Sequence, residues 1–559
     1  MFERTPDWWR SAVVYQIYPR SFADSDGDGF GDVPGIIAHL DYLAELGVDV
    51  LWLSPIYASP QDDNGYDISD YRDIDPMFGT LADVDALIAA AHERGMALVM
   101  DMVVNHTSDE HPWFVESRDP ASEKRSWYYW HAARDGATPG EPGAEPFNHP
   151  SVFGGSAWQY DEASGEYYLH IFSRKQPDLN WENPAVREAI YDMMNWWVDR
   201  GVDGFRLDVI NLISKPLSAD GSPAEGSDAF DINPFDGPRI HEFLHEMNQR
   251  VFRGHNLLVV GETPGTTPEQ GLRYTDPANE ELDMVFQFEH VELDQQPGQP
   301  KWALKPLDLR ELKASLERWQ LALADGWNSL YWNNHDQPRI VSRWGNDSDE
   351  HRVTSAKTLG TILHLHKGTP YIYQGEELGM TNAGFDSIEQ YRDLESLNHY
   401  QAAVASGVPA EMFLVALAAK SRDNARTPML WDASEHAGFT TGEPWLPVNA
   451  NHTEINAAAQ VGDDESVFAH YQRLIALRHD HEIVREGVFE LLAPDHDRLW
   501  AFTRTLGTER WLVIANFSSA PLGLPGDLQV ADAELMLATH DERDASVLQP
   551  WESRVLKLS

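Results

Sequence analysis

Eight short apolar runs, several of them separated by segments with a helical repeat, constrain the fold of this chain more than any other feature. They are rich in Val, Ile, Tyr and Trp, and they lie at Val13–Tyr18, Val50–Leu53, Ala97–Val103, Gly204–Leu207, Leu257–Val260, Met284–Phe288, Ser329–Trp332 and Thr369–Tyr373. Such runs match the buried strands of a parallel sheet, and their alternation with helices is the pattern of βα units. We therefore predict an α/β fold, a (β/α)8 (TIM) barrel. Because such a barrel takes about 250 residues, the 559-residue chain also has room for insertions and another domain.

Three of the predicted helices have recognisable ends. A helix commonly begins after a Thr or Asn cap or at a first-turn proline, and it commonly stops at a glycine. Apolar residues at helical spacing between such signals predict helices with limits at Ile36 and Gly47, at Thr80 and Gly95, and at Asn183 and Gly201.

The spacing between the third and fourth runs is too long for a single loop. Residues 105–178 are rich in Gly, Pro, His and aromatic residues, so we expect an inserted subdomain after strand three. Within it, residues 158–161 and 167–170 flank Gly165. This pattern predicts a small hairpin.

The remaining domain limits follow from changes in the spacing of apolar and polar residues along the sequence. After the eighth run comes an insertion at about 381–465, then an amphipathic helix through residues 467–477. From 485 to 559 the chain reads as short alternating strands, which predicts a C-terminal antiparallel β-domain, a β-sandwich. The barrel then comprises residues 1–104 and 179–484.

Composition excludes several classes of partner and chemistry. The chain has 90 acidic and 42 basic residues, a net charge of -48, which repels nucleic acid and anionic membranes and favours solubility. It contains no Cys, so disulfides, thiolate metal sites and Cys nucleophiles are excluded. No apolar stretch of about 18 residues and no signal-like N-terminus occur. We expect a soluble cytoplasmic protein, monomeric by default.

Polar residues follow the apolar runs at the end where a barrel carries its active site. Arg206 lies two residues before Asp208, on the same face of the fourth strand. The strand-end residues are Asp67, Asn105, His106, Asp208, Glu262, Asn333, Asn334, His335, Asp336, Glu376 and Glu377. Any one such carboxylate is as readily a helix cap or an ion-pair partner, but the whole set favours a functional site.

Two of these carboxylates suit glycoside hydrolysis, which needs an acid for the leaving oxygen and a carboxylate at the oxocarbenium-like centre. Asp208 and Glu262 follow adjacent strands. We expect Arg206 to keep Asp208 ionised, whereas Glu262 must hold a proton and therefore needs a raised pKa.

With these residues in place, the chain resembles glycoside hydrolase family 13, the α-amylase family. The matching segments are Asp101–His106, Gly204–Asp208, Gly261–Thr263 and Asn333–Asp336, in the order of the family's four signature regions. The resemblance implies that Asp208 is the nucleophile, Glu262 the acid/base and Asp336 the transition-state stabiliser. It also implies that His106 and His335 bind hydroxyls of the glucose in subsite −1.

The resemblance adds residues that close this subsite. Asp67 matches a residue that holds the non-reducing glucose, and Tyr66 beside it belongs to the same substrate-binding set together with Arg206. Arg422, in the segment Ser421–Pro428, looks like the salt-bridge partner of Asp67. A closed subsite −1 implies exo cleavage of short oligosaccharides.

A second motif is the acidic, glycine-punctuated loop at residues 24–32. Alternating acidic residues suit a hard cation, but Gly35 stands where an EF-hand needs its bidentate Glu, so this is no EF-hand. In the α-glucosidase branch that the chain resembles, a matching loop binds a structural Ca²⁺ or Mg²⁺, and no organic cofactor is implied. The expected ligands are Asp24, Asp26, Asp28, the Phe30 carbonyl and Asp32. An acidic turn without an ion is the alternative.

Within the family, the chain is most similar to the oligo-1,6-glucosidase group. Val209, directly after the expected nucleophile, goes with α-1,6 linkages there, and residues 176–180 fit the same group. Leu430 and the segment Phe147–Phe153 depart from its usual pattern, which affects the aglycone side. An α-1,4-glucosidase, a trehalose-6-phosphate hydrolase and a transglucosylase stay open. A sucrose isomerase fits less well, because its Arg-Leu-Asp-Arg loop is absent after residue 339. A non-catalytic binding protein is the remote alternative.

Overall fold

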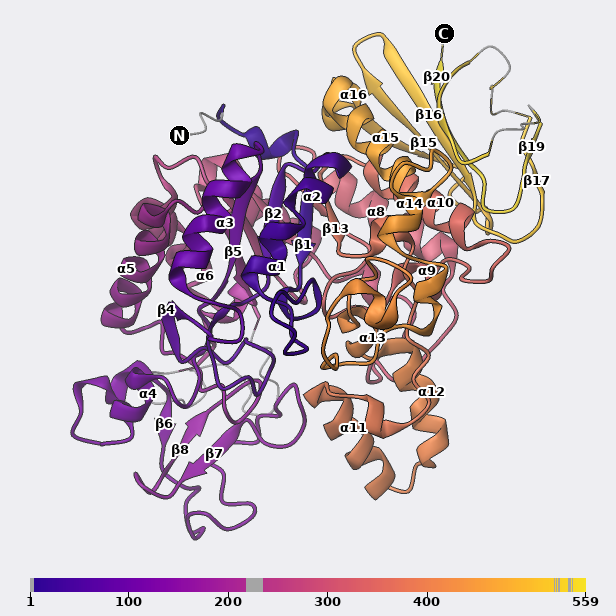
Figure 1. Ribbon diagram of the computed structural model, residues 1–559. Helices are drawn as coiled ribbons and strands as arrows, with labels where there is room; N and C mark the ends of the chain where they lie inside the picture. Colours follow the sequence, from indigo (N-terminus) through magenta and orange to yellow (C-terminus); the bar gives the residue numbers. More distant parts are fainter. Residues whose placement is uncertain are drawn as a thin grey trace.

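The computed structural model describes residues 5–217, 235–526, 528, 530, 533–540, 544 and 546–558. Within them, eight strands form one parallel sheet in the order β11-β10-β9-β5-β2-β1-β13-β12. A parallel bridge between Val285 and Asn328 joins the two ends of this order and closes the barrel (Figure 1). The strands are β1 (Val14–Ile17), β2 (Val50–Leu53), β5 (Ala97–Val103), β9 (Gly204–Asp208), β10 (Leu258–Glu262), β11 (Met284–Phe286), β12 (Ser329–Leu330) and β13 (Thr369–Tyr373).

Each strand of the barrel is one of the eight predicted apolar runs, and the predicted fold class is confirmed. Alternate side chains serve two cores, as the period of a strand requires. Val14 belongs to the cluster that also holds Val50, Ala97 and Leu258. Tyr15, its neighbour, belongs to the larger cluster between the strands and the surrounding helices.

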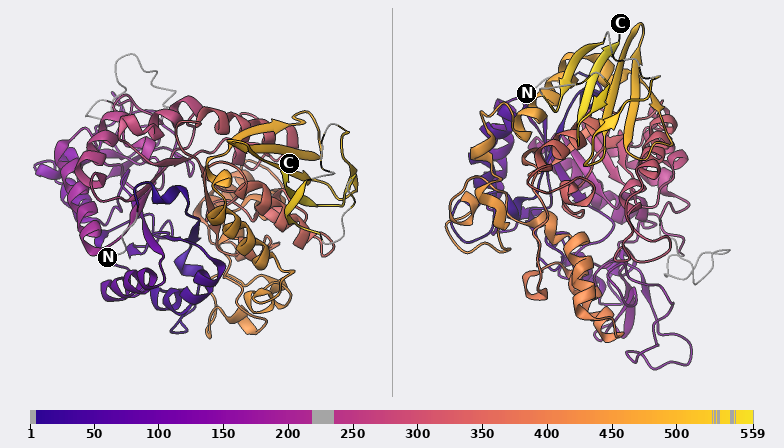
Figure 2. Two further views of the ribbon diagram at one scale, coloured as in Figure 1. Left: turned by 90° about the horizontal axis from the view of Figure 1, so that it is seen from above. Right: turned by 90° about the vertical axis from the view of Figure 1, so that its right-hand side faces the viewer.

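Helices surround the barrel, as the view from above shows (Figure 2, left). They are α1 (Val33–Ala38), α2 (Leu40–Leu46), α3 (Leu81–Glu93), α5 (Pro184–Arg200), α6 (Ile240–Met247), α7 (Pro268–Thr275), α8 (Leu309–Ala322), α9 (Ile340–Arg343) and α10 (Arg352–His364). The predicted limits of α3 and α5 are confirmed: Thr80 caps α3 through a capping box with Asp83, and Asn183 caps α5. The helix predicted before Gly47 is instead two helices, because the backbone of His39 leaves the helical conformation.

Residues 105–178 form a lobe beyond the third barrel strand. It contains α4 (Pro112–Ser117) and an antiparallel sheet in the order β6-β8-β7. The predicted hairpin is confirmed as β7 (Trp158–Asp161) and β8 (Glu166–Leu169), and β6 is Trp130–His131. A separate short antiparallel pair, β3 (Tyr57–Ala58) and β4 (Asp70–Ile74), lies in the segment between β2 and α3.

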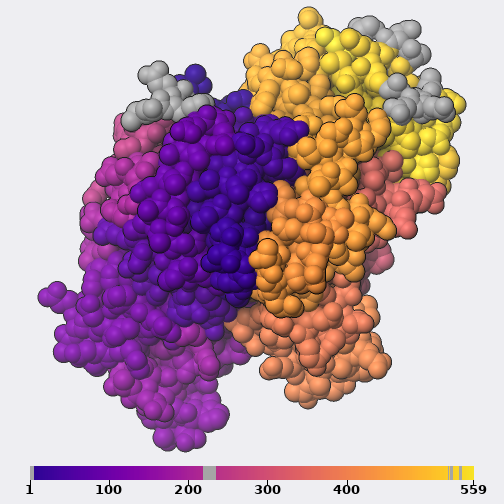
Figure 3. Space-filling model, in the orientation of Figure 1, coloured from indigo at the N-terminus to yellow at the C-terminus, as the bar shows by residue number. Residues whose placement is uncertain are grey.

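A second lobe follows β13. It contains α11 (Leu394–Ala405) and α12 (Ala410–Lys420). Further along the chain come α13 (Asp423–Arg426) and α14 (Ala457–Gln460), the latter in contact with the following helix α15 (Val467–Asp480). In Figure 3, α11 and α12 and the lobe of residues 105–178 project from the same end of the molecule, with a notch between them. The segments that carry the strand-end residues therefore lie between two lobes.

The chain ends in a separate antiparallel sheet at the far end of the barrel (Figure 1). The predicted amphipathic helix is confirmed as α15 (Val467–Asp480), followed by α16 (Glu482–Glu486). The sheet order is β14-β15-β16-β20-β18, and β17 pairs with β19. These strands are β14 (Val488–Leu492), β15 (Leu499–Leu506), β16 (Glu509–Asn516), β17 (Leu522–Gly523), β18 (Glu534–Ala538), β19 (Val547–Leu548) and β20 (Ser553–Leu558). In the described part of the chain, no helix has both the length and the apolar character needed to cross a bilayer.

Candidate active site

The ends of β5, β9 and β10 bring the predicted catalytic residues together. These strands are neighbours in the barrel, and Arg206 on β9 is in register with Asp101 on β5 and Val260 on β10. Asp208 and Glu262 end their strands. Because neighbouring parallel strands end at the same edge, both carboxyl groups lie at the mouth of the barrel.

Arg206 is the shared partner of three carboxylates. Its Nη1 lies 2.7 Å from Asp208 Oδ1 and 2.8 Å from Asp101 Oδ1, and its Nη2 lies 2.6 Å from Glu262 Oε2. All four side chains are buried. The predicted contact with Asp208 is therefore present, but Arg206 also binds the expected proton donor and Asp101, neither of which was predicted.

Burial raises the pKa of both carboxyl groups, those of Asp208 and Glu262. The pKa of Glu262 is about 8, because burial and the neighbouring Asp208 outweigh the attraction of Arg206. Burial also raises the pKa of Asp208, to about 7, although Arg206 favours its charged form. The higher of the two values belongs to Glu262, the group expected to hold the proton. The expected contrast between the two environments is small, because one guanidinium serves both.

Val209 positions Glu262 through its backbone. Its N–H donates to Glu262 Oε2 at 3.0 Å, and its φ of 35° lies in the left-handed region. That conformation is strained for a β-branched residue and is characteristic of functional sites. Side-chain patterns carry no signal for this contact, since it depends on the main chain.

Asp336 carries the most stabilised negative charge of the site. Its Oδ1 lies 2.5 Å from Arg426 Nη2 and 3.5 Å from Arg422 Nη1. Burial opposes ionisation, but His335 and these two arginines hold the pKa of Asp336 far below its usual range. Asp393, fully buried, binds Arg422 at 2.6 Å and so fixes the guanidinium from its other side. The contacts of Asp393 and Arg426 had not been predicted.

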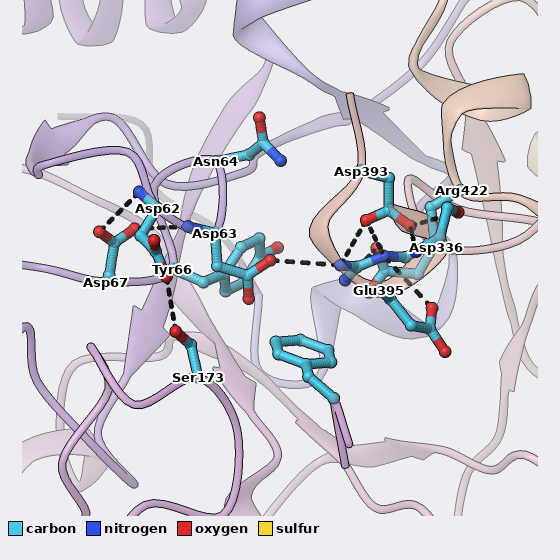
Figure 4. Close-up of polar contacts among 12 residues, drawn as sticks. Asp62, Asp63, Asn64, Tyr66, Asp67, Ser173, Asp336, Asp393, Glu395 and Arg422 are labelled. Carbon is cyan, nitrogen blue, oxygen red and sulfur yellow. Dashed lines mark hydrogen bonds and ion pairs between the residues drawn. The ribbon is translucent and has the colours of Figure 1, made fainter. Parts of the chain in front are cut away.

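The predicted salt bridge between Asp67 and Arg422 is wrong. The carboxylate of Asp67 accepts the N–H groups of Asp62 at 2.8 Å and Asp63 at 3.0 Å, within its own loop. It is Asp63 whose Oδ1 lies 3.3 Å from Arg422 Nη2 (Figure 4). A run with three acidic residues contains no signal that distinguishes the one facing Arg422 from the one that shapes the loop.

The two predicted histidines lie in the site in neutral form. His106 Nε2 is 3.1 Å from the carbonyl oxygen of Tyr66, and His335 Nε2 is 2.7 Å from the Tyr66 hydroxyl. The rings of Tyr66 and His335 are parallel, with centroids 5.2 Å apart. Burial lowers the pKa of His106 to about 4 and that of His335 to about 3. Both therefore offer one N–H and one bare nitrogen at neutral pH.

Glu376 and Glu377 do not join this site, contrary to the strand-end prediction. Glu377 Oε1 accepts the hydroxyl groups of Tyr15 at 2.8 Å and Tyr42 at 2.7 Å. Glu376 Oε1 accepts that of Tyr471 at 2.9 Å. They belong to the packing between β13 and the helices.

The acidic loop groups three of its five predicted metal ligands. One carboxylate oxygen each from Asp24, Asp26 and Asp28 lie within 4.8 Å of one another. Burial and the neighbouring carboxylates raise the pKa of Asp28, whereas hydrogen bonds from Thr440 and from backbone N–H groups outweigh burial and lower that of Asp24. Asp32 instead caps α1 by accepting the N–H of Gly35 at 2.6 Å. The N–H of Phe30 donates to Asp28 at 2.8 Å.

Comparisons with known proteins agree with this geometry. Residues 16–487 match the model of the alpha amylase catalytic domain. The chain is 55% identical to an oligo-1,6-glucosidase of Parageobacillus thermoglucosidasius, with 99% of each chain covered. It is 51% identical to a trehalose-6-phosphate hydrolase of Bacillus subtilis, over 100% of this chain and 99% of the relative. The crystal structure of an isomaltulose synthase from Klebsiella sp. LX3 has a TM-score of 0.93 at 41% identity, with 100% of each chain covered.

Proposed function

The chain belongs to the α-amylase family of glycoside hydrolases, and on that basis we propose that it is a retaining, exo-acting α-glucosidase. Its substrates are short oligosaccharides, with a preference for terminal α-1,6-linked glucose. The shared contacts of Arg206 with Asp208 and Glu262 carry this proposal, because they place a nucleophile and a proton donor at one point of the barrel mouth.

In the proposed reaction, Asp208 attacks the anomeric carbon while Glu262 gives its proton to the departing glycosidic oxygen. The carbon–oxygen bond breaks and a covalent glucosyl ester forms on Asp208. Glu262, now ionised, takes a proton from water, whose oxygen attacks the same carbon and releases glucose and free Asp208. Asp336, ionised, stabilises the positive charge that develops on the sugar in each step.

The spacing of the two carboxyl groups supports retention of configuration. Retaining enzymes hold them about 5–5.5 Å apart, whereas inverting enzymes need about 6.5–9.5 Å for an intervening water. Two carboxyl groups bound to the two terminal nitrogens of Arg206 favour the shorter spacing.

Cleavage from the chain end is supported by the ion pair between Asp63 and Arg422. These residues come from opposite sides of the mouth, the loop after β2 and the segment before α13 (Figure 4). Arg422 also binds Asp393 and Asp336. A pocket closed on this side accepts one terminal sugar and stops a longer chain from passing through.

The preference for α-1,6 bonds is supported by Val209 and by the relatives of high identity. Val209 packs with Ile171 and Leu212, and Phe172 and Phe235 border this cluster. We propose that this apolar surface receives the aglycone. The relatives include both oligo-1,6-glucosidases and a trehalose-6-phosphate hydrolase, so a phosphorylated substrate is the competing possibility.

The pairing of cations around the mouth favours a neutral substrate. Among the described residues, Arg206, Arg422 and Arg426 are each bound to carboxylates. A phosphate next to these pairs would be repelled by their carboxylates. Phosphate binding is strongest at cations that have no carboxylate partner.

We further propose that Asp24, Asp26 and Asp28 bind a structural Ca²⁺ or Mg²⁺. Three converging carboxylate oxygens suit a hard cation, and the ion would neutralise the charge that they concentrate. The proposed reaction uses none of these side chains. The monomeric state and the cytoplasmic location stay predictions from the sequence.

A substrate panel tests the proposed function. Isomaltose, maltose, sucrose, trehalose and trehalose-6-phosphate are each supplied to wild type and to Asp208→Asn. The highest kcat/KM is expected on isomaltose, with activity lost by a factor of about 10⁴ or more in the variant, as for other catalytic nucleophiles. A higher kcat/KM on trehalose-6-phosphate would show that the phosphorylated sugar, and not isomaltose, is the substrate. Undiminished turnover by Asp208→Asn would overturn the mechanism.

The anomer released first provides an independent check. Proton NMR of fresh reaction mixtures is expected to show α-glucose before mutarotation. Initial β-glucose would contradict retention. The same spectra measure the fraction of glucose transferred to sugar acceptors, because transglucosylation yields new glycosidic signals in place of free glucose.

A further inference from the structure

The side chain of Gln16, on β1, contacts the nitrogen of His335 that faces away from Tyr66. Gln16 Nε2 lies 2.8 Å from His335 Nδ1 and 3.2 Å from Ser54 Oγ. Gln16 and His335 are each 1% exposed, so water does not compete for these contacts. The mechanism proposed above assigns no part to Gln16.

An amide nitrogen donates hydrogen bonds and does not accept them. His335 Nδ1 must therefore be bare where it meets Gln16, and a neutral ring then carries its proton on Nε2. That proton points at Tyr66 Oη, 2.7 Å away. The contact with Gln16 thus selects one of the two neutral tautomers.

The contacts of Tyr66 and Asp101, on the other side of His335, lead to the same assignment of its proton. Asp101 binds Arg206 through Oδ1 at 2.8 Å, and a carboxylate in such a pair only accepts. The Tyr66 hydroxyl therefore donates its proton to Asp101 Oδ2, at 3.0 Å. Its oxygen is left to accept from His335 Nε2. Donors and acceptors match along the whole chain from Gln16 to Arg206.

We propose that Gln16 is a positioning residue that holds His335 as the tautomer with a proton on Nε2, so that His335 donates a hydrogen bond to a substrate hydroxyl. This inference rests on the proposed α-glucosidase function. In the free enzyme the N–H is held by Tyr66. When glucose enters subsite −1, the same N–H serves a sugar hydroxyl without a change of tautomer, so the site is already arranged for its substrate.

The test combines Gln16→Met with substrates that lack one hydroxyl. Met has a similar volume and shape but can neither donate nor accept strongly. Once glucose replaces Tyr66 as the partner of Nε2, no contact at Nδ1 then selects the tautomer. The substrates are p-nitrophenyl α-glucoside and its 2-, 3-, 4- and 6-deoxy forms. In wild type, removal of the hydroxyl that His335 serves lowers kcat/KM. In Gln16→Met this loss is expected to shrink by about tenfold at that one position, the strength of one good hydrogen bond, and to be unchanged at the others.

Gln374→Met is the matched control. Gln374 is also a buried glutamine at the mouth, but its amide contacts the backbone of Tyr18 at 2.7 Å and of Ser21 at 3.4 Å. It is expected to leave the pattern of losses across the deoxy substrates as in wild type. If Gln16→Met and Gln374→Met change that pattern alike, Gln16 has only a packing role and the proposal is wrong.

A second variant, Gln16→Glu, keeps the test independent of packing defects. The introduced carboxyl group donates to Nδ1 when protonated, as the amide does, but it only accepts once ionised. Its kcat/KM relative to wild type is therefore expected to fall as pH rises. Asp336, Arg206, Arg422 and Arg426 also face the ring, but they are present in both proteins and cancel in the ratio. A ratio independent of pH would refute the proposal.

The failures of the two proposals are distinguishable. If wild type does not cleave p-nitrophenyl α-glucoside or isomaltose, the proposed function fails. If wild type cleaves them but Gln16→Met and Gln16→Glu behave as wild type on every deoxy substrate and at every pH, only the inference about Gln16 fails.

Discussion

Lys215 Nζ lies 2.9 Å from Asp178 Oδ2, in a buried ion pair that joins the segment after β9 to the end of the lobe formed by residues 105–178. The same ammonium group donates to Asn105 Oδ1 at 2.8 Å and to the carbonyl oxygen of Leu212 at 3.0 Å. Three oxygens from three chain segments therefore surround one cation. Asn105 also donates to His106 Nδ1 at 3.1 Å, so this junction supports a residue of the proposed active site.

Replacing Lys215 with Met is expected to destabilise the protein by about 3–5 kcal/mol, because Asp178 is left buried without its partner. Chemical denaturation measures the loss, and limited proteolysis is expected to cut within residues 105–178 first. The matched control is Lys305→Met, which removes an exposed pair with Glu311 and should cost less than about 1 kcal/mol. Equal effects of the two substitutions would show that the buried cation does not hold the lobe.

Asp63→Asn and Asp67→Asn separate the two roles of the loop after β2. Asp63→Asn removes the charge that faces Arg422, and kcat/KM on isomaltose is expected to fall about 100-fold, since one partner of a buried charged pair is worth about 2–5 kcal/mol. Asp67→Asn keeps only one of the two carboxylate oxygens that each accept an N–H of the loop, and it places an NH2 group against the other N–H. It should lower the thermal midpoint of unfolding, and it should lower kcat/KM much less than Asp63→Asn does. The reverse order of effects on kcat/KM would restore Asp67 as the sugar-binding residue.

Activity is expected to follow a narrow bell-shaped pH profile with its maximum between about 7 and 8. Asp208 must be ionised to attack, so kcat/KM falls as pH drops through its pKa of about 7. Glu262 must be protonated to donate, so kcat/KM falls as pH rises through its pKa of about 8. The two groups share Arg206, and the limbs therefore report the pair as a whole.

Glu262→Gln tests which group causes the alkaline limb. With p-nitrophenyl α-glucoside, whose leaving group needs little protonation, the first step survives the substitution. The alkaline fall of that step should disappear while the acid limb is retained. An alkaline limb that persists in Glu262→Gln would assign it to another group.

The barrel and the positions of its strand-end residues were predictable because they depend on short-range patterns. Each strand appears as an apolar run, and the residue that ends a run lies at the mouth whatever the rest of the fold does. Asp208 and Glu262 were placed at the mouth in this way. The same rule does not tell which way a side chain points after its strand ends, which is why Glu377 was misassigned: it turns toward Tyr15 and Tyr42.

The ion pair across the mouth was not predictable on the same grounds. Asp63 and Arg422 are 359 positions apart in the sequence, and their contact depends on the path of two irregular segments. The choice between Asp63 and Asp67 rests on loop geometry that has no periodic signal. The contact between the Val209 N–H and Glu262 is likewise set by a left-handed turn that a β-branched residue rarely adopts.

Removal of divalent cations is expected to lower stability without lowering kcat at 25 °C. A cation bound by Asp24, Asp26 and Asp28 would stabilise the folded protein by about 2.7 kcal/mol at 100 times its dissociation constant. Thermal unfolding is compared with EDTA, Ca²⁺ or Mg²⁺, and the ion with the larger increase in midpoint is the preferred one. Asp26→Asn should abolish the increase, whereas Glu45→Gln, which removes an exposed carboxylate outside the loop, should keep it. An equal response to Ca²⁺ in wild type and Asp26→Asn would place the ion elsewhere.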